Sequence, residues 1–171
     1  MGGVKHDNGK AEARYFYFAG MVPFLDDQNA RIMALQYEDM VKELLKGERG
    51  RALAGLSAMI QVITKSLQDS FKISATEVLG GVSKVSKLGA EKYGLFNYQK
   101  GMDWSRLVDA LGRHMTSYFM KDFIDEESTL DHRYHMLANC FMLSYYLYKD
   151  VGVNDLKETE NEQQSVPEIK D

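Results

Sequence analysis

Two prolines, Pro23 and Pro167, are the only ones in the 171 residues of this chain. Because proline ends helices and interrupts sheets, the long stretch between them can form uninterrupted regular structure. Apolar side chains recur there every three or four residues, which is the period of a helix face and not of a strand. The pattern predicts an all-α protein, and the length suits one domain with its own core.

About five helices are predicted, bounded by residues that begin or end helices. Asp26-Asp27 is a suitable cap for the first helix, and Gly47 ends it. Ser74 lies three residues before Glu77, which is the spacing of a capping box. The predicted helices are 28–46, 52–71, one from Ser74 to Gly94, one that opens at Asp103 or Trp104, and 128–149.

The apolar faces of the first two helices indicate how they pack. In helix 52–71 the apolar residues recur every three or four positions and form a narrow seam. Such a seam packs against another helix, which can belong to the same chain or to a second subunit. A homo-oligomer is therefore predicted. The residues on these faces are Ile32, Leu35, Met40 and Leu44 in the first helix, and Leu53, Leu56, Ile60, Ile63 and Leu67 in the second.

The domain organisation follows from composition. Residues 1–150 are predicted to form a single helical domain, and the polar, acidic segment 151–171 a disordered tail. The N-terminus lacks the apolar core of a signal peptide, and no apolar run approaches the roughly 20 residues of a membrane span. A cytoplasmic protein with no membrane partner is expected.

Charge and cysteine content exclude two further classes. The net charge of −4 offers no basic face for duplex nucleic acid. The single cysteine, Cys140, rules out an internal disulfide framework. Since its neighbours are apolar, it is interpreted as a buried group and not as a nucleophile.

Histidines and carboxylates gather in the second half of the chain. His132, His135 and Asn139 share one helix face by their spacing, and His114 belongs to the preceding helix. Two histidines on one face, such as His132 and His135, can hold a metal ion. Alternatively, they are a surface pair, or core histidines bonded to carbonyls. The acidic segment around Asp125 is likewise either a solvated loop or an oxygen cage for Mg²⁺ or Mn²⁺.

Several cationic side chains are candidates for phosphate binding. Arg106 and Arg113 lie on one helix face, where a guanidinium suits phosphate, although Asp109 between them makes ordinary ion pairing an equal alternative. Glu91 lies in the last turn of its helix, where an anion is disfavoured and a nearby cation would compensate.

A series of short motifs includes these residues. In order, they are Asp7-x-Gly9-Lys10, Gly89-Ala90-Glu91-Lys92-Tyr93-Gly94, Asn97-Tyr98, Gly101, Trp104-Ser105-Arg106-Leu107, Ala110-Leu111-x-Arg113-His114, and Asp125-x-Glu127-Ser128-x-x-x-His132-x-x-His135-x-x-x-Asn139. The series resembles the phage dATP/dGTP diphosphohydrolase family, that of MazZ-type enzymes. The resemblance covers the first ten residues and about 75–148, whereas 11–74 is an atypical helical extension.

The resemblance implies a MazG-like, all-α nucleotide pyrophosphohydrolase. Such an enzyme converts dGTP or dATP into the monophosphate and pyrophosphate with a divalent metal, Mg²⁺ or Mn²⁺, with Co²⁺ or Zn²⁺ as alternatives. In some phages this reaction supplies dGMP for 2-aminoadenine nucleotides and withdraws dATP. Deoxypurine nucleotides are therefore the expected partner.

Carried onto this chain, the resemblance implies three groups of site residues. Glu91 and His114 are the candidate catalytic residues. The candidate substrate-binding residues are Lys10, Lys92, Asn97 and Arg113. The candidate metal ligands are Glu91, Asp125, Glu127, His132 and His135.

Two departures accompany the resemblance. The familiar MazG pattern Glu-Glu-x-x-Glu followed by Glu-x-x-Asp is not present, so a four-carboxylate cage does not transfer to this chain. Lys121-Asp122 replaces the family's usual Gly-Glu before the acidic segment. The region 11–74 is open to two roles, an oligomer interface or a different base pocket.

Two rival functions remain. A His-Asp phosphohydrolase is disfavoured because the chain's one His-Asp pair, His6-Asp7, has no histidine before it. A non-catalytic nucleotide sponge or regulator, acting against host defence signalling, would keep the pocket without turnover. Product analysis separates all three functions.

Overall fold

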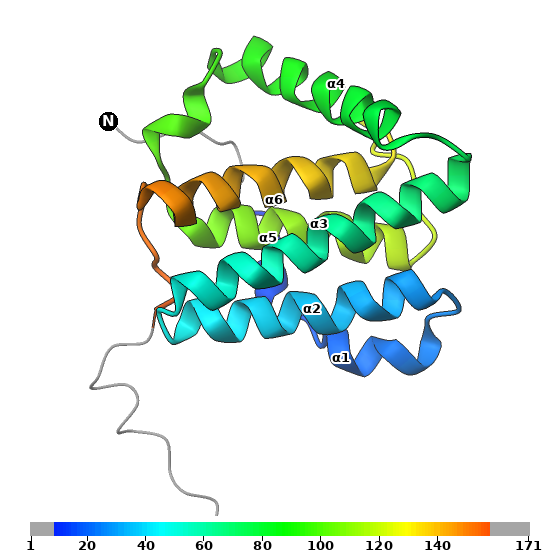
Figure 1. The fold of residues 1–171 in the computed structure, drawn as a ribbon, viewed down its shortest axis with the longest axis horizontal. Helices are drawn as coiled ribbons and strands as arrows, with labels where there is room; N and C mark the ends of the chain where they lie inside the picture. Colours follow the sequence, from blue (N-terminus) through cyan, green and yellow to red (C-terminus); the bar gives the residue numbers. More distant parts are fainter. Residues whose placement is uncertain (1–8, 158–171) are drawn as a thin grey trace, which may run out of the picture.

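The structure is a computed structural model that describes residues 9–157, and it is a bundle of helices (Figure 1). Within that range regular structure is helical, and β pairing is limited to the isolated bridges Asp103–Val153 and Ile124–Asp131. The all-α prediction is confirmed. The α-helices are α1 (Phe18–Met21), α2 (Gln28–Leu45), α3 (Arg49–Phe71), α4 (Ala75–Tyr93), α5 (Trp104–Phe119) and α6 (His132–Lys149), and the 3-10 helices are η1 (Ala13–Tyr15), η2 (Val22–Phe24) and η3 (Asn97–Lys100).

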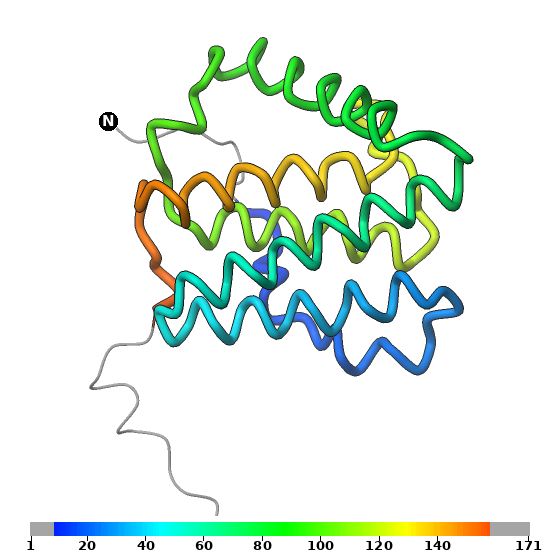
Figure 2. Tube along the Cα trace, in the orientation of Figure 1, coloured from blue at the N-terminus to red at the C-terminus, as the bar shows by residue number. Residues whose placement is uncertain are grey.

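Two antiparallel helix pairs make up the bundle. α2 and α3 lie side by side, α5 and α6 form the second pair, and α3 packs on α6 to join them (Figures 1 and 2). The short α1 covers α2, and α4 packs on α6. The apolar core between the pairs is closed, with its largest fully buried side chains being Trp104, Tyr37, Tyr146, Phe18, Met33, Met40, Leu44, Leu56, Met59, Ile63, Leu67 and Leu107.

The caps predicted from sequence form the expected contacts. The Asp27 carboxylate accepts the backbone N–H of Asn29 at 2.9 Å and so begins α2. Ser74 and Glu77 make both hydrogen bonds of the capping box at the start of α4. Gly94 follows α4 with φ +94°, a conformation that other residues rarely adopt.

The inward face of α2 differs from the predicted one. Ile32 and Leu35 are 37% and 48% exposed. The buried stripe instead follows Met33, Tyr37, Met40 and Leu44, because the Tyr37 hydroxyl donates to the carbonyl of Val108 at 2.9 Å and turns that face towards α5.

Region 11–74, predicted as an extension, provides about half of the buried core residues. The predicted seam on α3 is filled by α2 and α6 of the same chain. Leu56, Ile63 and Leu67 are fully buried there. A homo-oligomer stays a prediction, and it would have to form through another surface.

The start of the predicted tail at residue 151 is too early. Trp104 donates its indole N–H to the carbonyl of Val151 at 2.8 Å, and the carboxylate of Asp155 accepts the backbone N–H of Ser105 at 3.0 Å. Leu156 is buried as well. This segment thus caps α5 from outside the helix, while the rest of the predicted tail, 158–171, lies outside the described residues.

α6 begins four residues later than predicted, because residues 120–131 form a loop with its own backbone bonds. Lys121 and Thr129 adopt left-handed backbone angles, with φ of 63° and 62°. Asp131 then caps α6 by accepting the backbone N–H of Arg133.

A buried ion pair anchors the start of α6. Asp131 and Arg133 contact through two side-chain bonds of 2.9 Å, and both side chains are 4% exposed. The Arg133 guanidinium also donates to the backbone carbonyl and hydroxyl of Ser66 and to the hydroxyl of Ser70. This network fastens α6 to α3.

No helix within residues 9–157 has the combination of length and apolar character needed to cross a bilayer.

Removing the charge of Asp131 should destabilise the fold strongly. Asp131→Asn keeps an oxygen for the cap but leaves the buried guanidinium without a counter-charge, which costs about 3–5 kcal/mol. Urea unfolding followed by circular dichroism measures this as a lower midpoint at unchanged slope. Asp69→Asn makes the same change in an exposed pair with Lys65 and should barely move the midpoint; equal losses in both variants would refute the assignment.

Adjacent glycines test the packing of α4 on α6. A Cβ at Gly81 would lie 2.2 Å from a ring carbon of Tyr134, whereas a Cβ at Gly80 meets nothing within 4 Å. Gly81→Ala should therefore lose about 1–3 kcal/mol of unfolding free energy. Gly80→Ala should gain up to about 1 kcal/mol, since alanine suits a helix better than glycine. The same unfolding measurement compares them, and indistinguishable midpoints would contradict this packing.

Candidate functional site

Three side chains converge where α5 runs into α6. His114 comes from the last third of α5, Asp125 from the connecting loop, and His132 is the first residue of α6. Each offers one ligand atom, and these three atoms lie within 4.8 Å of one another. Two imidazole nitrogens and a carboxylate oxygen form a donor set that can hold a divalent ion.

Backbone hydrogen bonds of the loop place these groups. Asp125 donates its N–H to the carbonyl of Leu130 and accepts the N–H of Thr129, both at 2.8 Å. The N–H of His132 donates to the carbonyl of Phe123 at 2.8 Å. The loop therefore folds back on itself and brings Asp125 to the first turn of α6.

The two histidines face each other through ring nitrogens. Nδ1 of His114 and Nδ1 of His132 are 2.8 Å apart, so one must donate to the other. His132 is 6% exposed, and its Nε2 has no hydrogen-bond partner within residues 9–157. A buried polar atom without a partner costs about 1–3 kcal/mol, so this ring is suited to binding a further group.

His135 lies beside this group as a supporting residue. Its ring stacks on His114 with centroids 4.5 Å apart, and its Nε2 lies 2.6 Å from the hydroxyl of Ser128 and 3.5 Å from Asp125. Burial lowers the pKa of His135 more than Asp125 raises it, so the neutral imidazole is favoured. His132 and His135 are thus neither a surface pair nor core histidines bonded to carbonyls.

Ser128, for which the sequence predicts no role, organises the acidic side of the site. Its backbone N–H donates to Asp125 at 2.9 Å, while its hydroxyl accepts from the backbone of Leu130 and meets His135. Burial alone would raise the pKa of Asp125, but the hydrogen bonds from Ser128 and the nearby His135 and His114 lower it overall. The carboxylate is therefore held in its charged form, ready for a cation.

Other predicted site residues surround the cluster. Lys92, near the end of α4, forms an ion pair with Glu127 of the loop. Glu91 is exposed in the same turn of α4, and neither glutamate belongs to the group of three ligand atoms. Asn97 is 6% exposed at the start of η3.

The N-terminal segment lies along α5. Arg113 donates to the backbone carbonyl of Ala11 at 2.7 Å, which places the exposed Lys10 next to Ala11 on the same side of the bundle. Asp109, considered above as an ion-pair partner for the arginines of its own helix, forms an ion pair with Arg14, whose backbone N–H also donates to Asp109 at 3.0 Å. Gly112 allows this approach, since a Cβ there would lie 2.7 Å from Ala13.

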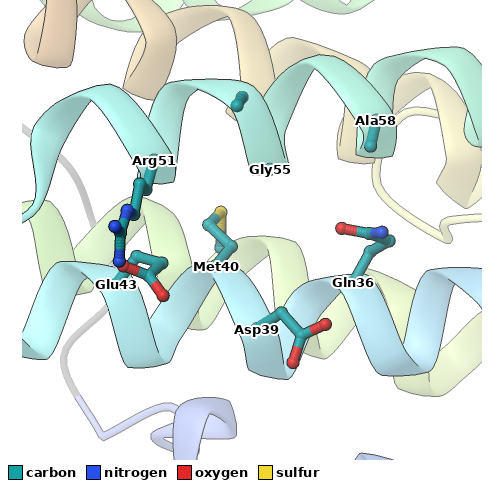
Figure 3. A pocket seen from close by; sticks show the side chains of 8 residues that line it. Gln36, Asp39, Met40, Glu43, Arg51, Gly55 and Ala58 are labelled. Carbon is teal, nitrogen blue, oxygen red and sulfur yellow. The ribbon is translucent and has the colours of Figure 1, made fainter.

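A shallow hollow of about 320 Å³ lies on the outside of the bundle between α2 and α3 (Figure 3). Arg51 of α3 and Glu43 of α2 point toward each other at one end of it. Its lining contains none of the predicted site residues, and all of it comes from α2 and α3. The hollow is therefore separate from the histidine cluster.

Fold and site together define an all-α protein with a candidate metal centre of two histidines and one aspartate. The sequence profile of the family described as dATP/dGTP diphosphohydrolase, N-terminal, matches residues 64–156, and the chain belongs to this family. The prediction of the dATP/dGTP diphosphohydrolase family is confirmed, and so is the predicted enzyme class, a nucleoside triphosphate pyrophosphohydrolase. Comparisons with curated proteins and with solved structures give no match.

The matched range has a structural meaning. It begins in the second half of α3, inside the region assigned to the extension, and it includes α4, α5, α6 and the segment that caps α5. All three members of the candidate metal centre lie within it. Residues 1–63, which contain Lys10 and α2, lie outside it.

Cys140 should be chemically inert in the folded protein. It is fully buried, and burial raises the pKa of its thiol to about 12. Ellman's reagent should therefore leave the native protein unmodified and should react with one thiol per chain in denaturant. Rapid reaction of the native protein would show that α6 opens or packs differently.

Proposed function

We propose that this protein hydrolyses dGTP and dATP to the monophosphate and pyrophosphate with a divalent ion held by His114, Asp125 and His132. The observation that carries the proposal is the convergence of these three ligand atoms within the range that matches the diphosphohydrolase family. Carboxylate and imidazole donors fit a divalent ion.

The ion would supply charge neutralisation on the phosphates and a lower pKa for a water molecule. In the proposed reaction the water oxygen bonds to the α-phosphorus, and the bond from that phosphorus to the oxygen bridging to the β-phosphate breaks. Pyrophosphate leaves with the electron pair of that bond. The proton of the water passes to a protein base.

Glu91 is the proposed base. His114 was the alternative, but its ring belongs to the ligand group and faces His132. Glu91 is exposed in the α4 turn next to Lys92, and Lys92 reaches the acidic loop through Glu127. A carboxylate at this position can take a proton from a water near the loop.

The phosphates are assigned to cations at the edge of the site. Lys92 would exchange Glu127 for a phosphate, since a phosphate offers more negative charge than one exposed carboxylate. Lys10 and Arg113, brought together by the bond from Arg113 to Ala11, would stabilise the departing pyrophosphate. Asn97 completes the proposed substrate-binding set with an amide from η3.

The biological use of such an enzyme follows from its products. In a phage, the reaction would withdraw dATP and supply dGMP for 2-aminoadenine nucleotides. The host cytoplasm and a homo-oligomeric assembly belong to the same proposal.

Substitution at the metal and base positions tests the assignment. His132→Ala and Glu91→Ala should each lower turnover of dGTP by at least about 100-fold, because each removes a group that acts in the transition state. Pyrophosphate release with added divalent ions measures the rate, and circular dichroism checks that the helices persist. Glu126→Gln changes an exposed carboxylate next to Asp125 and should keep near-normal activity.

Product analysis in the same assay distinguishes the rivals. Monophosphate and pyrophosphate support the proposal, whereas nucleoside and triphosphate would indicate the His-Asp phosphohydrolase reaction. Tight binding with intact nucleotide recovered would favour a sponge. Near-normal activity of both alanine variants would overturn the site.

A further inference from the structure

The candidate centre contains two nitrogen donors for every oxygen donor. His114 and His132 each contribute a ring nitrogen, and Asp125 contributes a carboxylate oxygen. Mg²⁺ and Ca²⁺ prefer oxygen ligands, and Mg²⁺ usually keeps several waters. Imidazole instead suits Zn²⁺, Co²⁺ and Ni²⁺, which bind a given nitrogen site more tightly than Mn²⁺ or Mg²⁺.

The spacing of the two rings also fits one small ion between them. Two nitrogens bound to a tetrahedral ion at about 2.0–2.1 Å lie roughly 3.3 Å apart. The Nδ1 atoms of His114 and His132 are 2.8 Å apart, so a small opening of the pair is sufficient. The ring that donates in this contact would also have to carry its proton on Nε2 instead, so that both Nδ1 atoms can hold the ion.

Neighbouring contacts hold the donors in place. Ser128 fixes Asp125 through a 2.9 Å bond from its backbone. The first turn of α6 is fastened by the buried Asp131–Arg133 pair, which flanks His132 on both sides. Such support from outside the ligand set typically accounts for about 10–100-fold in metal affinity.

Burial at the centre is uneven. His132 is 6% exposed, whereas the side chain of Asp125 is 20% exposed. An ion of the Mg²⁺ type usually keeps several water ligands. The buried side of the centre, at His132, does not easily accommodate them. The open side at Asp125 leaves room for a phosphate oxygen.

We infer that His114, Asp125 and His132 form a site for one transition-metal ion of the Zn²⁺, Co²⁺ and Ni²⁺ class, in preference to Mg²⁺. The role of this ion in hydrolysis rests on the proposed function, but its binding does not. It narrows the expectation from the sequence, which was Mg²⁺ or Mn²⁺ with Co²⁺ or Zn²⁺ as alternatives.

Cobalt is the probe, because Co²⁺ bound by imidazole has a visible absorption that free Co²⁺ shows only weakly. The full-length protein, freed of metal with a chelator, is titrated with Co²⁺ without nucleotide. We expect saturation at one equivalent per chain and binding at least about 100-fold tighter than that of Mg²⁺ measured by competition.

Three variants locate the ion. His114→Gln and His132→Gln should each weaken Co²⁺ binding by at least about 10-fold and change the absorption spectrum, because each removes an imidazole. His132→Asp should reduce the preference for Co²⁺ over Mg²⁺, since it exchanges nitrogen for oxygen. Glu126→Gln should bind as the parent protein does, and thermal unfolding identifies any variant that has lost its fold.

The outcomes separate this inference from the proposed function. Co²⁺ bound as expected, without hydrolysis of any deoxynucleotide, would support the site and overturn the function. Hydrolysis with Mg²⁺ alone, together with equal affinities for Mg²⁺ and Co²⁺, would overturn the site and keep the function. Co²⁺ binding unchanged in both folded glutamine variants would also overturn the site.

Discussion

The buried ion pair between Asp131 and Arg133 fixes the part of the molecule on which the site depends. Asp131 begins α6, Arg133 reaches across to Ser66 and Ser70 of α3, and His132 stands between them. A guanidinium buried in this way requires each of these partners, because an unmatched buried charge is far more costly than a buried apolar group. The orientation of the first turn of α6 is therefore tied to α3, and α3 is held in turn by α2. The N-terminal region thus supports a site to which it contributes no ligand of the metal centre.

The opposite side of the site is held much more weakly. The buried residues of α4 are Val78, Gly81 and Val82, all in its first half. Its C-terminal turn contacts the acidic loop through the ion pair of Lys92 and Glu127, whose side chains are 46% and 67% exposed. Exposed pairs of this kind contribute roughly 0–1 kcal/mol, so the exchange of Glu127 for a phosphate proposed above would cost little. A rigid centre on α5 and α6 beside an easily exchanged contact on α4 suits an enzyme that must admit and release a charged substrate.

The sequence predicted helices and caps well, because these depend on neighbours a few residues apart. Ser74 with Glu77, Asp27 and Gly94 are local signals, and each appears in the structure as expected. His132 and Asp125 were predicted as metal ligands and lie together, while His114, predicted as a base, lies among the ligand atoms. Long-range and irregular contacts were missed. Arg14 pairs with Asp109 from 95 positions away, and no periodic pattern marks it.

Loop 120–131 is a second feature that the sequence pattern did not predict. Its course depends on left-handed angles at Lys121 and Thr129, residue types that rarely adopt them. Because the sequence does not reveal these angles, helix propensity predicted that α6 begins at 128. The cap of Asp131 and the bonds of Arg133 to α3 instead fix the start of α6 at 132, which brings His132 to the first turn beside Asp125.

The donor set also bears on how an acidic protein attracts a nucleotide. The chain carries a net charge of −4, and the loop beside the site is rich in carboxylates. A dication held by four carboxylates would give a centre of net negative charge, which repels a triphosphate until further cations arrive. Two neutral imidazoles and one carboxylate leave the same dication with a net positive charge, and the charge of a bound ion dominates its surroundings. In the proposed site, histidines in place of carboxylates would thus let one ion attract the phosphates where a carboxylate cage would need several, and Lys92 would add positive charge nearby.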